Sequence, residues 1–107
     1  MILTEEEFKV LLMLYAANID GSICLDEVEV MLDKSCPDSV KKIKKVFSIM
    51  SDMEVLECIC ENKSKYAATE PSRIVMMRDL RDIIEADEKV TPMEEQLLRI
   101  MQRLLKS

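Results

Sequence analysis

Two short stretches of the chain repeat one arrangement of acidic and apolar residues. The first spans 18–27 and reads NIDGSICLDE, and the second spans 85–94 and reads EADEKVTPME. In each stretch an Asp precedes a Glu by seven positions: Asp20 and Glu27 in the first, Asp87 and Glu94 in the second. Carboxylate oxygens are the ligands that Ca²⁺ and Mg²⁺ prefer in proteins. These four side chains are therefore the candidate metal ligands of this sequence.

The first stretch matches part of an EF-hand calcium loop. With Gly21 at the turn position of such a loop, Asp20 and Glu27 fall on two of the ligand positions. Ala16 and Cys24 occupy two other ligand positions, and neither side chain supplies the oxygen that a hard cation needs. The second stretch lacks both the glycine and the first ligand. The sequence therefore predicts a weaker or differently arranged site for a divalent cation such as Ca²⁺ or Mg²⁺, built on one acidic pair or the other.

The same residues also have a structural interpretation, as a helix corner used twice. Each Asp can accept backbone N–H bonds from the turn that follows it, and Gly21 can adopt a positive φ. The branched residues Ile23 and Val90 are expected to fill the core. Glu27 and Glu94 are expected to cap the helix that comes next. Both interpretations remain open from the sequence.

These corners belong to a predicted set of six helices. Thr4 with Glu7, and Thr91 with Pro92 and Glu94, are strong signals for helix starts. Polar residues at 62–65 are expected to end the fourth helix in a flexible connection. Apolar residues at helical spacing and these breaks predict helices at about 4–19, 25–34, 38–50, 53–62, 69–87 and 91–105.

Composition supports an all-α fold. The 107 residues are 49% hydrophobic, 34% charged and 4% aromatic, with one glycine and nine methionines. A chain of this length forms one domain with a sizeable core. We expect one compact bundle over 1–107, in which two similar helix-corner-helix hairpins pack on each other around the third and fourth helices.

The net charge of the chain and the length of its apolar runs limit the classes of partner that it could bind. The chain has 21 acidic and 15 basic residues and a net charge of -6, which disfavours nucleic acid. Four lysines at 41–45 are expected to form a solvated face of the third helix. The apolar run 10–19 is too short to span a bilayer, which predicts a core helix. The start of the chain lacks the pattern of a signal peptide, so we expect a cytoplasmic protein.

Catalytic chemistry has little support in the sequence. Histidine is absent, which removes the commonest general base and the commonest transition-metal ligand. The cysteines, expected to be reduced thiols, are Cys24, Cys36, Cys58 and Cys60. The last two point about 200° apart on a helix and cannot easily share a metal. We therefore expect no enzymatic activity.

The methionines favour a second class of function, protein binding. Methionine is pliable, and several of the nine could line a groove for a partner helix or belong to the core. The continuous apolar run 74–77 requires a helix that buries two faces or contacts another protomer. Ile74 is one of the apolar residues whose spacing marks this helix, and a partner protein or a homodimer is expected.

Two segments carry a resemblance to a known family. They are LYAANIDGSICLDEVEVML at 14–32 and LRDIIEADEKVTPMEEQLLRIM at 80–101. This pattern resembles the tellurite-resistance TerB-like family of all-helical domains. The resemblance implies a non-enzymatic binding or scaffolding module, either cytoplasmic or peripheral to a membrane. It also implies a module that is metal-responsive through acidic corners and linked to stress or tellurite resistance. The alternative is a protein-interaction domain whose acidic corners are purely structural.

Overall fold

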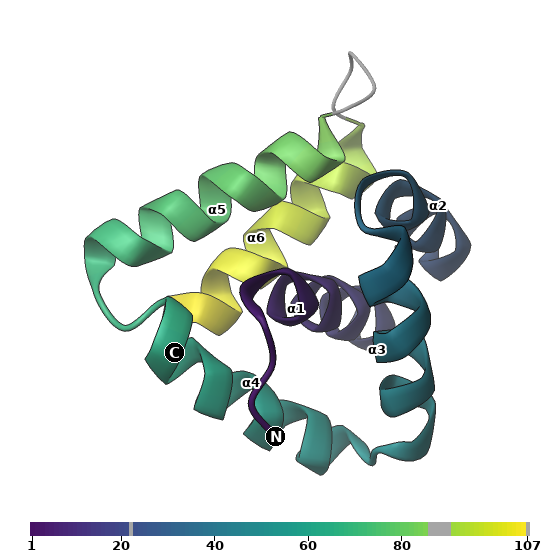
Figure 1. Ribbon diagram of the computed structural model, residues 1–107. Coiled ribbons are helices and arrows are strands. Elements are labelled where there is room, and N and C mark those ends of the chain that lie inside the picture. Colours follow the sequence, from purple (N-terminus) through teal and green to yellow (C-terminus); the bar gives the residue numbers. More distant parts are fainter. Residues whose placement is uncertain (22, 86–90, 107) are drawn as a thin grey trace.

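The computed structural model describes residues 1–21, 23–85 and 91–106, and over these residues the chain is entirely helical or loop, as the sequence predicted. The molecule is a bundle of six described helices (Figure 1). Their bounds are α1 Glu5–Ile19, α2 Leu25–Ser35, α3 Pro37–Ile49, α4 Asp52–Tyr66, α5 Glu70–Ile84 and α6 Pro92–Lys106. The predicted starts agree with these bounds to within about two residues, as do the ends of α1, α2, α3 and α6.

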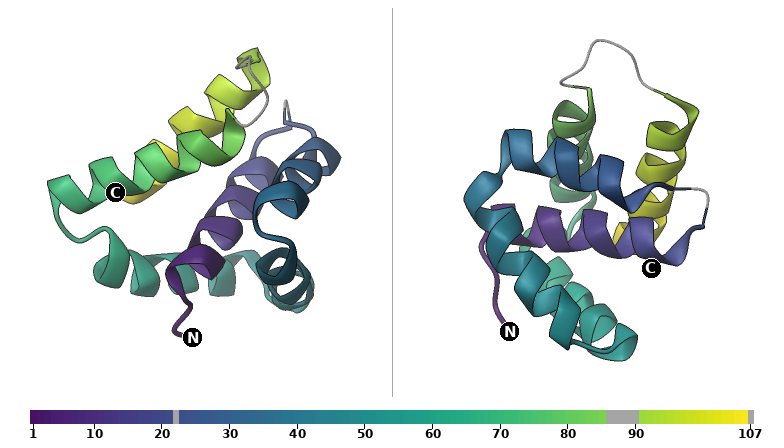
Figure 2. Two further views of the ribbon diagram at one scale, coloured as in Figure 1. Left: turned by 45° about the horizontal axis from the view of Figure 1, so that its top comes forward. Right: turned by 90° about the vertical axis from the view of Figure 1, so that its right-hand side faces the viewer.

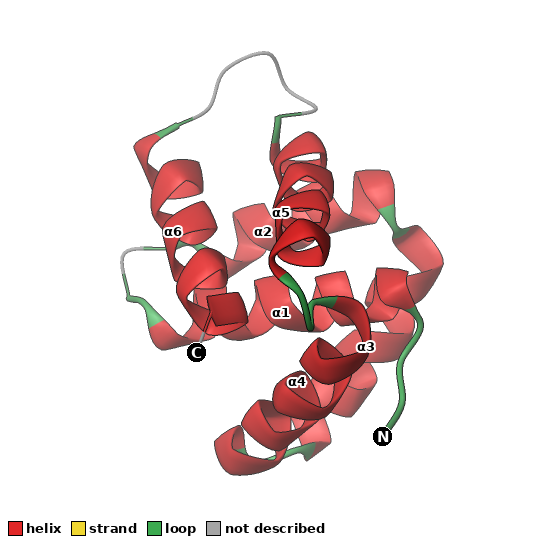
Figure 3. Cartoon of the chain, turned by 90° about the vertical axis from the view of Figure 1, so that its left-hand side faces the viewer, coloured by secondary structure: helices red, strands yellow, loops and turns green. Residues whose placement is uncertain are grey.

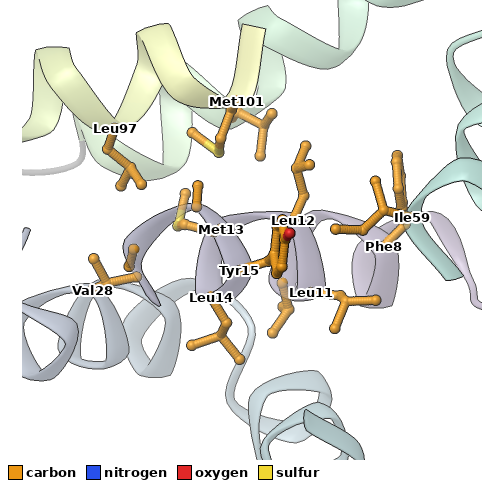
Figure 4. Close-up of a cluster of buried hydrophobic side chains, with 14 of the residues drawn as sticks. Phe8, Leu11, Leu12, Met13, Leu14, Tyr15, Val28, Ile59, Leu97 and Met101 are labelled. Atoms are coloured by element: carbon orange, nitrogen blue, oxygen red, sulfur yellow. The ribbon is translucent and has the colours of Figure 1, made fainter. Parts of the chain in front are cut away.

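The centre of the bundle is α1. Every residue from 10 to 17 is buried, and eight successive positions cover all directions around a helix. The helix contacts α2, α3, α4 and α6, and the views in Figure 2 show it enclosed by them. Side chains from several helices meet around it in Figure 4, where Leu97 and Met101 of α6 lie on one side and Ile59 of α4 lies beside Phe8. The apolar run therefore forms a core helix, as predicted.

The predicted arrangement of the hairpins was correct in one respect and wrong in another. The hairpins do contact each other, through α1 with α6 and through α2 with α5. However, α3 and α4 lie at the periphery and α1 occupies the centre (Figures 1 and 2). The physical reason is that α1 is apolar on all its faces, whereas α3 exposes its lysines to solvent.

Hydrogen bonds and ion pairs hold the start of α1 and join the lysines of α3 to neighbouring helices. Thr4 and Glu7 form the predicted capping box, with the Glu7 N–H donating to Thr4 Oγ1 at 3.2 Å. Lys42 Nζ lies 2.7 Å from Glu7 Oε2 and joins α3 to this start. The Lys42 ammonium and then the Thr4 backbone N–H hold the pKa of the Glu7 carboxyl below its usual value. Lys44 makes a second ion pair, to Glu29 of α2, at 3.2 Å.

The fourth helix corrects one prediction. The polar residues 62–65 were expected to be a flexible connection, but they continue α4 to Tyr66. Asn62 is fully buried, and its amide holds the extended residues before α1. Its Oδ1 accepts the Leu3 N–H at 2.8 Å, and its Nδ2 donates to the Met1 carbonyl at 2.9 Å. Long-range hydrogen bonds override the local preference of these polar residues for a turn.

The apolar residues that mark α5 are not all buried. Ile74 is 63% exposed, while Met76 and Leu80 are buried. The helix ends at Ile84, and the predicted end near 87 falls outside the described residues. Within the described part of the chain, no helix has the length and apolar character needed to cross a membrane.

Candidate functional site

The two acidic corners, far apart in the sequence, start helices that contact each other. The Cys24 N–H at the start of α2 donates to Met93 Sδ in the first turn of α6, at 3.4 Å. Gln96 Nε2 of α6 donates to Asp20 Oδ2 at the end of α1, at 3.1 Å. Figure 3 shows the α1–α2 connection beside α6. The structure therefore brings the first corner against the start of α6.

A pocket lies between the first turns of α2 and α6. We call it the corner pocket, and its volume is about 370 Å³. Its lining combines a mainly apolar surface with three carboxylates, and consists of Asp26, Glu27, Val30, Met31, Thr91, Met93 and Glu94. Two of the four predicted ligands, Glu27 and Glu94, therefore face the same space from different corners.

The Glu94 and Glu27 carboxylates of this pocket differ in their burial and in their hydrogen bonds. Glu94 is buried and closes the predicted capping box of α6, since its Oε1 accepts the Thr91 N–H at 2.8 Å. The Glu94 N–H in turn donates to Thr91 Oγ1 at 3.2 Å. Glu27 is exposed in the first turn of α2. Glu27 is thus the more accessible of the two to a bound group.

The other two predicted ligands lie elsewhere. Asp20 accepts a hydrogen bond from Gln96 and lines a different hollow of about 360 Å³, together with Ile19 and Arg103. Asp87 falls outside the described residues. Among the described residues, no three Cys, Asp or Glu side chains come together in a group that could hold a metal ion. The proposed cation site therefore remains a prediction.

Several features of the first corner differ from the structural interpretation. Gly21 does not have a positive φ, and the space around it is open, so no conformational demand for glycine is evident there. Glu27 does not cap α2, because the Cys24 N–H that it would accept is donated to Met93 instead. Ile23 is buried in the core as predicted, and Val90 lies outside the described residues.

Sequence reasoning missed most of the apolar lining of the corner pocket. Val30 is 54% exposed, and it lies one turn after Asp26 on the same face of α2. The sequence does indicate this face of α2. Val28 and Leu32 are the inward positions of the helix, and Val30 lies away from them. Met93 is one of the nine methionines that the sequence could assign either to a groove or to the core, and nothing local indicates that α6 begins beside α2.

The four cysteines fall into two classes. All are free thiols, with Cys24 and Cys60 exposed and Cys36 and Cys58 buried. Burial raises the pKa of the Cys36 thiol to about 11, and burial also raises the pKa of Cys58. Since Cys58 and Cys60 lie on opposite sides of α4, the predicted divergence of their side chains is confirmed.

These classes predict the order of alkylation. Thiolate is the reactive form of cysteine, so the exposed Cys24 and Cys60 should react with iodoacetamide well before the buried pair in the native protein. Mass spectrometry of the digested protein after timed quenching measures this order. Unfolding in urea provides the control, in which all four thiols should react at similar rates. Equal rates for Cys36 and Cys60 in the native protein would contradict the prediction.

The corner pocket joins an apolar floor to an acidic rim, which suits a group that is both apolar and cationic. The floor includes Met31 and Met93, and methionine adapts its shape to what it contacts. The rim includes Asp26 and Glu27, both exposed to solvent. No family model, curated protein or solved structure matches this chain. A function is therefore inferred from the residues that line the corner pocket.

Proposed function

We propose that this chain is a non-enzymatic binding module that docks a basic, apolar segment of a partner protein in the corner pocket. The observation that carries the proposal is a half-exposed Val30 beside two methionines under an acidic rim. An exposed apolar surface rimmed by polar groups is a common feature of interaction sites. A cytoplasmic setting, expected from the four free thiols, belongs to the same proposal.

The chemistry of a lysine or arginine side chain matches this lining. Such a side chain places its aliphatic stem along apolar surface and keeps its charged head in a polar environment. In the corner pocket the stem would contact Met31 and Met93, and the head would lie near Asp26 and Glu27. The net charge of -6 favours the approach of a basic partner over an acidic one. Glu94 supports the non-enzymatic role, because its carboxylate already serves the helix cap.

A divalent cation is the second candidate for the corner pocket. It is favoured by Glu27 and Glu94, which come from different corners and line one space. The resemblance to TerB-like domains points in the same direction, including the link to stress or tellurite resistance. The exposed carboxylate of Glu27 is the one that an ion would reach most easily.

Peptide titration followed by NMR tests the first candidate. The ligands are an amphipathic helical peptide of leucine and lysine, and the same peptide with every lysine replaced by glutamate. We expect the lysine peptide to shift the signals of Val30, Met31 and Met93. The double variant Asp26→Asn, Glu27→Gln should bind it roughly two- to thirtyfold more weakly, at about 0.2–1 kcal/mol for each exposed ion pair.

Two controls make this test specific. Asp33→Asn changes the charge on the same helix at an exposed position that does not line the corner pocket, and it should leave the affinity almost unchanged. Calorimetry with Ca²⁺, Mg²⁺ and Mn²⁺, on the protein and on Glu27→Gln, tests the second candidate. Binding of the glutamate peptide as tight as that of the lysine peptide would contradict the proposal. Heat at millimolar ion that disappears in Glu27→Gln would favour the cation instead.

A further inference from the structure

A second pocket lies between α5 and α6, away from both corners. Its volume is about 550 Å³, and we call it the α5–α6 pocket. Its lining combines polar and apolar side chains, and consists of Glu70, Arg73, Ile74, Met77, Gln102, Leu105 and Lys106. An adjoining hollow of about 250 Å³ shares Arg73, Leu105 and Lys106. Cationic side chains therefore gather here in a protein whose net charge is -6.

Arg73 is the unusual member of this lining. Its side chain is half-buried, and its Nη1 donates to the Ala68 carbonyl across a long 3.5 Å. Over the described parts of the chain, no carboxylate lies within 4.0 Å of its guanidinium, although Glu70 lines the same pocket. A guanidinium carries five N–H donors in a planar fork that matches a carboxylate. Arg73 therefore presents unused donors toward a partly enclosed space.

The apolar side of the pocket lies next to these donors. Ile74 is 63% exposed at the pocket, while Met77 is half-buried and Leu105 is buried. Burial of an exposed isoleucine side chain under a ligand favours binding, because it removes apolar surface from water. The pairing of a cationic side with an apolar side selects for a molecule that has a charged end and a hydrocarbon end.

We propose that the α5–α6 pocket binds a small amphiphilic carboxylate. The carboxylate end accepts hydrogen bonds from Arg73 and faces Lys106, and the hydrocarbon end covers Ile74, Met77 and Leu105. The volume falls within the range of about 300–1,000 Å³ that is usual for small-molecule sites. The ligand is a free molecule and not part of a bilayer, because the net charge of -6 repels an anionic membrane while one small anion experiences chiefly the local cations.

A pair of amphiphiles of equal tail length and opposite charge tests this site. Decanoate and decyltrimethylammonium are titrated separately into isotopically labelled protein, below their micelle concentrations, and followed by NMR. We expect decanoate to shift the methyl signals of Ile74, Met77 and Leu105. Arg73→Gln should weaken decanoate binding roughly fivefold or more, because it removes a bidentate charged contact. Decyltrimethylammonium should leave these signals unchanged.

Two variants on α5 separate the proposal from simple hydrophobic adsorption. Arg81→Gln removes a guanidinium from the same helix, where it pairs with Glu85 at 3.1 Å outside the pocket, and it should preserve decanoate binding. Ile74→Glu changes an exposed residue, so the fold should survive while decanoate binding is lost. Equal binding of both amphiphiles, or full affinity in Arg73→Gln, would overturn the proposal. Binding to anionic phospholipid vesicles as strong as to decanoate would overturn the free-ligand assignment.

Discussion

Replacing Leu12 by Ala is expected to lower the free energy of unfolding by about 2–5 kcal/mol. Leu12 is fully buried in the middle of α1, which contacts α2, α3, α4 and α6. Neighbours on every side leave little room for the structure to collapse into the cavity, so the upper part of that range applies. Small domains are stable by only about 5–15 kcal/mol, so the loss is a large fraction of the total. Urea unfolding monitored by circular dichroism measures it.

The matched control is Ile19→Ala at the end of the same helix. Its side chain is 50% exposed, so its truncation should cost well under about 1 kcal/mol. A central α1 predicts a large difference between the two variants. Similar small losses for both would show that α1 is not enclosed, and would contradict the architecture itself.

Replacing Asn62 by Leu is the second change expected to have a large effect. The leucine fills a similar volume but leaves the Leu3 N–H without its partner, and the Met1 carbonyl then accepts only from Cys58 Sγ, at 3.7 Å. A buried polar group left unpaired costs about 1–3 kcal/mol, and the buried Leu3 N–H is such a group here. The residues before α1 would also lose protection, although Tyr66 Oη still donates to the Leu3 carbonyl at 2.6 Å. Unfolding in urea and hydrogen exchange at the Leu3 amide measure the two effects.

Ser64→Ala provides the control for Asn62. Its hydroxyl donates to the Cys60 carbonyl at 3.2 Å on the exposed side of the same helix. Its removal should change the free energy of unfolding by less than about 0.5 kcal/mol. If Asn62→Leu were equally harmless, residues 62–65 would act as the flexible connection that their composition predicted. Faster exchange at Leu3 in the Asn62 variant alone would confirm the anchor.

The candidate sites show where sequence reasoning reached its limit. Glu94 was recognised both as a helix cap and as a possible ligand, because Thr91 and Pro92 stand directly before it. Its capping bond is confirmed, and any role toward an ion stays a prediction. That Glu27 shares a pocket with Glu94 could not be deduced, because it depends on where α2 and α6 meet. Arg73 had no sequence signal at all, since its lack of a carboxylate partner among the described residues depends on which acidic groups the fold places around it.

By itself the sequence determined the all-helical fold, the six helices and most of their ends. Those features depend on residues within one or two turns of each other, as in the Thr4–Glu7 and Thr91–Glu94 caps. Only the tertiary structure decided that α1 is central, that Asn62 is an anchor, and that Ile74 is exposed. It also decided which side chains line the two pockets. The physical reason is that packing between helices sets burial and pairing, and residues distant in sequence contribute to it on equal terms with neighbours.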